Sequence, residues 1–115
     1  MNNYQPSLDS VFHALSDPTR RAIVQRLGQG SASVSELAVP FKMALPSFMK
    51  HVGVLEASGL IATRKAGRVR TCTINQERFR TIDTWLDEQR ALWQGRTNRL
   101  ADYVETLAAK ESDLD

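Results

Sequence analysis

Cysteine and histidine are scarce in this chain of 115 residues, which contains only Cys72, His13 and His51. One cysteine cannot form a disulfide within the chain, and three scattered residues do not supply the clustered ligands of a structural zinc site. Long apolar runs are also missing, and the first residues, MNNYQPSLDS, lack the basic and apolar regions of a secretory signal. We therefore expect a cytoplasmic protein that folds without a structural metal or a disulfide.

Acidic residues are missing from one long stretch, between Glu56 and Glu77. The surrounding residues 18–82 carry eleven Lys or Arg against three acids, although the formal net charge of the chain is only +2. Residues 83–115 have the opposite balance, with four Lys or Arg against eight acids. A segment this basic predicts a polyanionic partner, and a merely solvated basic surface is the alternative.

Groupings of catalytic residues are absent from the sequence as well. Ser47, His51 and Cys72 have side chains suited to catalysis, but none has a paired base, an acid or a glycine-rich oxyanion loop arranged around it. We therefore expect a protein that is not an enzyme and that uses no cofactor.

Capping residues and apolar spacing predict about five helices and one hairpin within a single domain over residues 1–115, with its core at about 8–108. Ser7 is suited to cap a first helix, and Asp17 before Pro18 a second. Ser33 and Glu36 have the spacing of a capping box for a short third helix. A fourth helix follows within ALPSFMKHVGVLEASG, and a last one covers residues 76–108.

The fourth expected helix has two different faces. One face would carry the apolar residues Leu45, Phe48, Met49, Val52 and Leu55, and the other Ser47, Lys50, His51 and Val54. A short helix, a turn and an amphipathic helix over residues 33–58 are typical of a helix-turn-helix, whose second helix enters the major groove of DNA. Ser47, Lys50 and His51 are therefore the predicted contacts of a recognition helix.

The apolar period changes to two directly after this helix. LIATRK and VRTCTI are strand-like runs joined by AGR, and Gly67 is able to adopt the positive φ of a tight turn. The hairpin over residues 60–74 would carry four cations towards DNA phosphates or a minor groove: Arg64, Lys65, Arg68 and Arg70. A helix-turn-helix with such a hairpin is a winged helix, although Lys and Arg also protect exposed strand edges from pairing.

The last expected helix has an apolar repeat of seven residues, the pattern of a helix that packs along another helix. We expect two copies of the chain to pair through it, with help from the first helix, and the alternative is a monomer whose last helix folds back on its own core. The predicted interface residues are Leu8, Val11, Phe12, Trp85, Leu86, Leu92, Trp93, Leu100, Tyr103 and Leu107.

Three segments in order resemble the ArsR/SmtB family of bacterial transcription regulators: FHALSDPTRRAIVQRL, VSELAVPFKMALPSFMKHVGVLEASGLI and RKAGRVRTCTI. The resemblance covers about residues 8–108 and implies a winged-helix homodimer that binds operator DNA, usually as a repressor released by an effector. It assigns DNA contacts to the same recognition-helix and hairpin residues. Ala44 and Gly53 depart from it, since family members often have Ser or Thr at the first position and a basic residue at the second.

The metal-binding motifs of the family are not present in this sequence. The run ELAVP has Ala38 and Pro40 where an arsenic or cadmium sensor has cysteines, and the last helix has no His or Cys for an intersubunit zinc site. The resemblance therefore predicts a regulator without a metal site.

Two hypotheses of function follow. The first is a mainly α, winged helix-turn-helix protein with a two-stranded wing, which dimerises through its terminal helices and binds an inverted-repeat operator as a repressor. The second is a winged-helix module that binds another protein and has no specific DNA site. Cys72 adds a possible redox switch, because the nearby Arg68 and Arg70 favour a thiolate.

Overall fold

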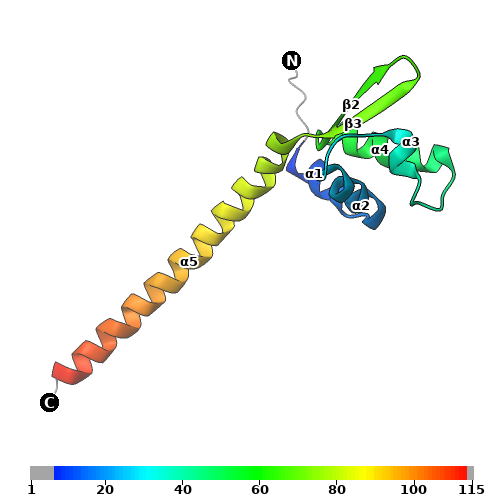
Figure 1. Ribbon diagram of the computed structural model, residues 1–115. Helices are drawn as coiled ribbons and strands as arrows, with labels where there is room; N and C mark the ends of the chain where they lie inside the picture. The colour runs from blue at the N-terminus through cyan, green and yellow to red at the C-terminus, as the bar shows by residue number, and fades with distance from the viewer. Residues whose placement is uncertain (1–6, 114–115) are drawn as a thin grey trace. The chain divides into compact units, whose positions relative to one another are not determined.

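The computed structural model describes residues 7–113 and contains five helices and three short strands (Figure 1). The elements in chain order are α1 (Leu8–Leu15), α2 (Pro18–Leu27), β1 (Ala32–Ser33), α3 (Val34–Ala38), α4 (Leu45–Ala57), β2 (Ile61–Ala66), β3 (Val69–Ile74) and α5 (Gln76–Asp113). No helix among the described residues is both long and apolar enough to cross a membrane. Internal contacts divide the chain into two units, Met1–Ile82 and Asp83–Asp115.

Capping residues begin the first three helices where the sequence predicted them. The Ser7 hydroxyl accepts a hydrogen bond from the backbone N–H of Ser10, and the Asp17 carboxylate accepts one from that of Arg20. Ser33 and Glu36 cap α3 reciprocally, each side chain accepting from the other residue's backbone N–H. Each cap satisfies an N–H that the helix itself leaves without a partner.

The core of the first unit lies where α1, α2 and α4 contact one another and where α3 and α4 contact the sheet. Phe48, Val52 and Leu55 of α4 are fully buried, as the apolar spacing predicted. The prediction was wrong for Leu45, which is 57% exposed, and for Val54, which packs against the core. A helical side chain leans towards the helix N-terminus, so the first residue of α4 has no earlier turn to cover.

The sheet has three antiparallel strands in the order β1-β3-β2, one more than the predicted two-stranded wing. Ala66 pairs with Val69, which leaves Gly67 and Arg68 as the turn, and Gly67 has the expected positive φ of 62°. Ala32 and Ser33 pair with Cys72 and Thr71 at the other edge of β3. The hairpin β2–β3 projects from the helices of this unit (Figure 1). Strand β1 pairs with the middle of β3, away from the turn.

Helix α5 has 38 residues and ends five residues beyond the predicted end, which gives a length of about 57 Å. Phe79 and Ile82 in its first turns pack against the core of the first unit. Further along, six apolar side chains are each 44% to 64% exposed: Leu92, Trp93, Leu100, Tyr103, Val104 and Leu107. These side chains are not covered within the single chain.

The predicted interface residues of α1 and early α5 have different environments. Val11 is 0% exposed in the core of its own chain, so its assignment to a contact with a second copy is corrected. Phe12 is 41% exposed and Trp85 37% exposed, while Leu8 and Leu86 are half-buried. Fully buried side chains have no surface left to offer a partner.

Candidate nucleic-acid interface

The first turns of α4 carry the polar side chains that the sequence assigned to DNA contact. Ser47 and Lys50 are exposed, and neither side chain has a hydrogen bond or ion pair to another residue in the range 7–113. Helix α4 is separated from α3 by residues 39–44, a longer connection than the predicted turn KMA, because α3 ends before Pro40. A serine hydroxyl and a lysine ammonium on exposed turns of a second helix are suited to contact base edges.

His51, the third predicted contact on α4, is half-buried and has partners within the chain. Its Nδ1 lies 3.2 Å from Nη1 of Arg20 and 3.7 Å from Oδ2 of Asp17. These partners come from the start of α2, 31 residues earlier in the case of Arg20. His51 therefore joins α4 to the start of α2.

Arg20 is a functional candidate that the sequence reasoning missed. It is only 9% exposed, and its guanidinium donates hydrogen bonds to the carbonyls of Ala14 and His13 at 2.7 and 3.1 Å. The sequence did contain an indication of its burial, because the helical spacing places Arg20 on the same inward face of α2 as Ile23 and Leu27. A buried arginine with several hydrogen bonds holds neighbouring elements in position.

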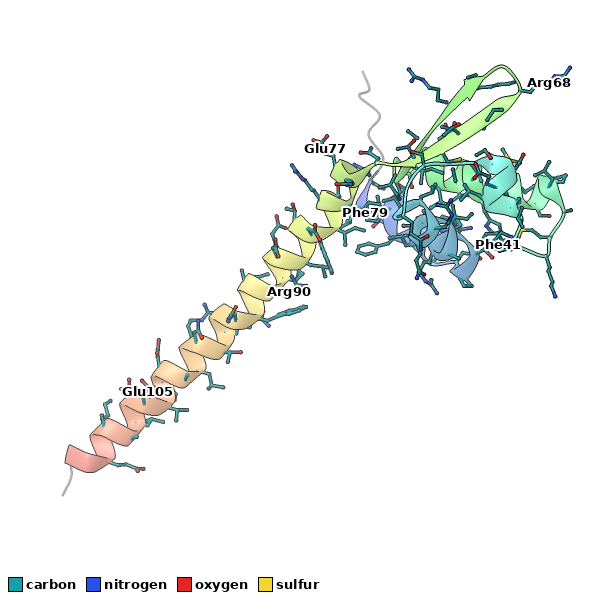
Figure 2. The ribbon with its side chains drawn as sticks, in the orientation of Figure 1. Phe41, Arg68, Glu77, Phe79, Arg90 and Glu105 are labelled. Atoms are coloured by element: carbon teal, nitrogen blue, oxygen red, sulfur yellow. The ribbon has the colours of Figure 1, made fainter. Side chains whose placement is uncertain are left out.

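The hairpin presents three of its four predicted cations freely. Arg64, Lys65 and Arg68 are exposed, and their side chains have no hydrogen bond or ion pair within residues 7–113. Figure 2 shows Arg68 at the turn of the hairpin, with its side chain directed away from the helices. The half-buried Arg70 differs, since its Nη1 donates to the Thr63 hydroxyl. Thr63 in turn donates to the carboxylate of Glu56 in α4.

Two of these cations stand directly opposite each other in the sheet. Lys65 pairs with Arg70 across the β2–β3 ladder, so both side chains lie on the same face of the hairpin. Like charges directly opposite each other destabilise a hairpin. The pair therefore concentrates positive charge on one face of the wing.

A hollow of about 440 Å³ lies beside this pair and connects the wing to the helix-turn-helix. It is lined by Met49 of α4, by residues at the start of α3 and by Lys65, Arg68 and Arg70. No acidic residue lines it. The positive charge of this hollow thus comes from the wing, and α4 contributes only the apolar Met49 to its lining.

Cys72 does not have the environment of a redox switch. It lies in the central strand β3 with 0% exposure, and burial, followed by the charge of Glu56, raises the pKa of its thiol. A protonated, buried thiol reacts slowly with oxidants. The hypothesis of a lowered pKa beside Arg68 and Arg70 was therefore wrong, because desolvation outweighs the attraction of Arg70.

Residues 7–113 contain no group of three His, Cys, Asp or Glu side chains able to hold a metal ion.

Asp17 and Glu36 have lowered pKa values, but the first cause in each case is a backbone hydrogen bond at a helix N-terminus, from Arg20 and Ser33 respectively. Both carboxylates thus serve as caps of helices.

Comparison with known proteins agrees with this geometry. Residues 15–64 match the family described as a helix-turn-helix domain. The chain is 33% identical over 113 residues to the HTH-type transcriptional regulator Rv2034 of Mycobacterium tuberculosis, covering 98% of this chain and 99% of the relative. It is 28% identical over 79 residues to the transcriptional repressor SdpR of Bacillus subtilis, covering 69% of this chain and 88% of the relative.

A solved structure is more similar still. The crystal structure of an ArsR family transcriptional regulator is 60% identical to this chain, with a TM-score of 0.74 over 76% of this chain and 96% of the other. Helix-turn-helix, wing and sequence similarity over nearly the full length lead to the same assignment. The chain belongs to the ArsR family of winged helix-turn-helix transcriptional regulators.

Proposed function

We propose that the protein is a homodimeric repressor that binds an inverted-repeat operator without a metal effector. The observation that carries the proposal is the cationic surface of the wing, which borders a hollow that extends to the start of α3 and to Met49 of α4. Its free lysines and arginines have no acidic partners among the described residues, as a surface that receives a phosphate backbone requires.

The division of labour follows from the position of each side chain. Helix α4 enters the major groove, where Ser47, Lys50 and His51 meet base edges. The wing lies over the adjacent backbone or minor groove, where Arg64, Lys65, Arg68 and Arg70 meet phosphates. The hollow between wing and helix provides room for the strand that passes between these two contacts.

Dimerisation is supported by the exposed apolar residues of α5. Leu92, Trp93, Leu100, Tyr103, Val104 and Leu107 are each at least 44% exposed in the single chain, more than a surface that stays in water normally carries on one helix. A second copy of the same helix is the occupant that the family resemblance implies. A two-fold dimer reads two half-sites in inverted orientation, so we expect a palindromic operator.

Repression is supported by the similarity to the transcriptional repressor SdpR of Bacillus subtilis. A metal is not proposed as the effector, because Ala38 and Pro40 stand at the positions of the thiolate ligands and α5 has neither His nor Cys. Release from DNA would then require another signal or a change in protein concentration.

A titration of DNA from upstream of the protein's own gene, followed by fluorescence anisotropy at several salt concentrations, tests the proposal. We expect tighter binding to this duplex than to a scrambled duplex, with an affinity that falls steeply as salt rises. Equal affinity for both duplexes would contradict a specific operator there. Absence of binding to either would favour the second hypothesis, a module that binds another protein.

A further inference from the structure

The guanidinium of Arg20 contacts three acceptors at the point where α1, α2 and α4 meet. Nε donates to the carbonyl of Ala14, Nη2 to the carbonyl of His13, and Nη1 lies 3.2 Å from Nδ1 of His51. An arginine side chain has five N–H donors and no acceptor. Nδ1 of His51 must therefore be the acceptor in this hydrogen bond, which requires it to carry no proton.

Asp17 does not change this assignment. Its Oδ2 lies 3.7 Å from the same Nδ1, which is longer than a hydrogen bond, whereas it accepts from the backbone N–H of Arg20 at 3.1 Å. One ring nitrogen cannot accept from Arg20 and donate to Asp17 at the same time. The contact with Arg20 is the shorter of the two, and a guanidinium can only donate, so this contact decides the tautomer of His51.

A neutral imidazole without a proton on Nδ1 carries it on Nε2. In the described part of the chain, every buried side-chain nitrogen or oxygen has a hydrogen-bond partner except Nη2 of Arg78. Nε2 of His51 makes no hydrogen bond within these residues. Since it is not among the buried atoms without a partner, it must be accessible to solvent. The recognition helix thus has one outward N–H donor at position 51.

We propose that Arg20 is a positioning residue that holds His51 as the Nε2–H tautomer, so that α4 presents a hydrogen-bond donor to an acceptor on a base edge. The inference rests on the proposed function, in which α4 enters the major groove. Acceptors there are N7 and O6 of guanine, N7 of adenine and O4 of thymine, whereas the N4 amino group of cytosine only donates. Position 51 should then select against a cytosine amino group.

Arginine is required at position 20 because its three contacts diverge. A lysine ammonium keeps the charge but is a single point on a flexible chain, and it cannot reach two carbonyls and the imidazole together in the fixed fork of a guanidinium. We therefore expect Arg20→Lys to release His51 while leaving the net charge unchanged.

The first test reads the tautomer directly in the free, full-length protein. Long-range ¹H–¹⁵N correlation spectra distinguish a protonated from an unprotonated ring nitrogen, and the chain has only two histidines. A His13→Gln variant assigns the two signals, since the side chain of His13 is exposed. We expect the spectrum of His51 to show a proton on Nε2 and none on Nδ1, and Arg20→Lys to shift it towards a mixture of tautomers.

The second test separates the two nitrogens by substitution. In His51→Asn the side-chain oxygen can still accept from Arg20, but the outward donor is lost, whereas in His51→Gln the longer amide can reach the position of Nε2. Selection from a pool of random duplexes then gives the half-site preference of each protein. We expect the preference for one base at one position of the half-site to be about fivefold weaker in His51→Asn, which corresponds to the loss of one hydrogen bond. His51→Gln should keep this preference.

The outcomes separate this inference from the proposed function. A protonated Nδ1 in the free protein, as Nδ1–H or as a charged imidazolium beside Asp17, would overturn the role of Arg20, as would a spectrum unchanged by Arg20→Lys. Equal loss of preference in both His51 variants would overturn the outward donor. Failure of the unaltered protein to select any sequence would instead contradict the proposed function, and the spectra would still report the tautomer.

Discussion

Ala44 stands at the N-cap of the recognition helix with extended backbone angles, φ −64° and ψ 146°, and makes no side-chain capping bond. A serine hydroxyl at this position would accept from an N–H of the first turn of α4. We expect Ala44→Ser to raise the free energy of unfolding by about 1 kcal/mol, measured by urea denaturation. Ala57→Ser at the other end of α4 is the matched control and should give no gain; equal effects at both positions would contradict the capping argument.

Cys72 should make the free energy of unfolding depend on pH in the alkaline range. Because burial raises the pKa of its thiol in the folded state, the unfolded chain loses this proton at a lower pH than the folded chain does. The free energy of unfolding should therefore decrease as the pH rises above about 8.5, the ordinary value of a thiol. Urea denaturation of Cys72→Ala, which has no such proton, should show a shallower decrease across the same range. Parallel curves for the two proteins would contradict the assignment.

Local residue choices were predictable from the sequence, while partners distant in the chain were not. Ser7, Asp17 and the pair of Ser33 and Glu36 act within one helical turn, so the sequence spacing alone specifies them. The contact between Arg20 and His51 spans 31 residues and depends on how α2 packs against α4. The spacing of apolar residues gave the buried centre of α4 correctly, but not the exposure of Leu45 at its end.

The end of α4 is held by a turn that requires a glycine. Gly59 has φ +82°, and an added Cβ would lie 3.3 Å from Arg78, whose Nε donates to the carbonyl of Ser58. We expect Gly59→Ala to lower the free energy of unfolding by about 1–2 kcal/mol, the cost of a left-handed backbone for an alanine. Gly53→Ala is the control, since nothing lies within 4 Å of its Cβ position, and it should stabilise α4 by about 0.5–1 kcal/mol. Similar changes in both urea midpoints would contradict the role of the turn.

The wing is the element whose charge should govern the salt dependence of DNA binding. Each phosphate contact contributes about −0.9 to the slope of log affinity against log salt. Lys65→Gln with Arg68→Gln removes four cations from the two wings of the dimer, so it should reduce the steepness of the slope by about 3.6. The charge-matched control is Arg90→Gln with Arg99→Gln on α5, and it should leave the slope unchanged. Anisotropy titrations at four or more salt concentrations measure both. An equal reduction in the control would mean that net charge acts without a wing contact.

Strand β1 shows why the sheet was only partly predictable from the sequence. Strands β2 and β3 have six residues each and a clear alternation, which the sequence reveals. Strand β1 has two residues, Ala32 and Ser33, too few for any period to appear. It exists because β3 offers an unpaired edge next to the start of α3, a condition that arises only when the sheet has formed.

At the scale of the whole molecule, the apolar residues of α5 test whether two chains associate. Leu100 is 64% exposed and continues the repeat of seven residues. In a two-fold dimer each substitution acts twice, so Leu100→Glu removes two buried leucines, worth about 3 kcal/mol together, and should weaken the dimer more than 100-fold. Sedimentation equilibrium at micromolar concentration should then show a monomer.

Asn98→Glu introduces the same charge on the opposite side of α5, so we expect it to leave the dimer intact. DNA binding links this change to function, because a monomer contacts one half-site and loses the added affinity of the second. Leu100→Glu should therefore bind the full operator no more tightly than an isolated half-site, whereas Asn98→Glu should still prefer the full operator. A monomeric unaltered protein, or equal effects of the two variants, would contradict α5 as the dimer interface.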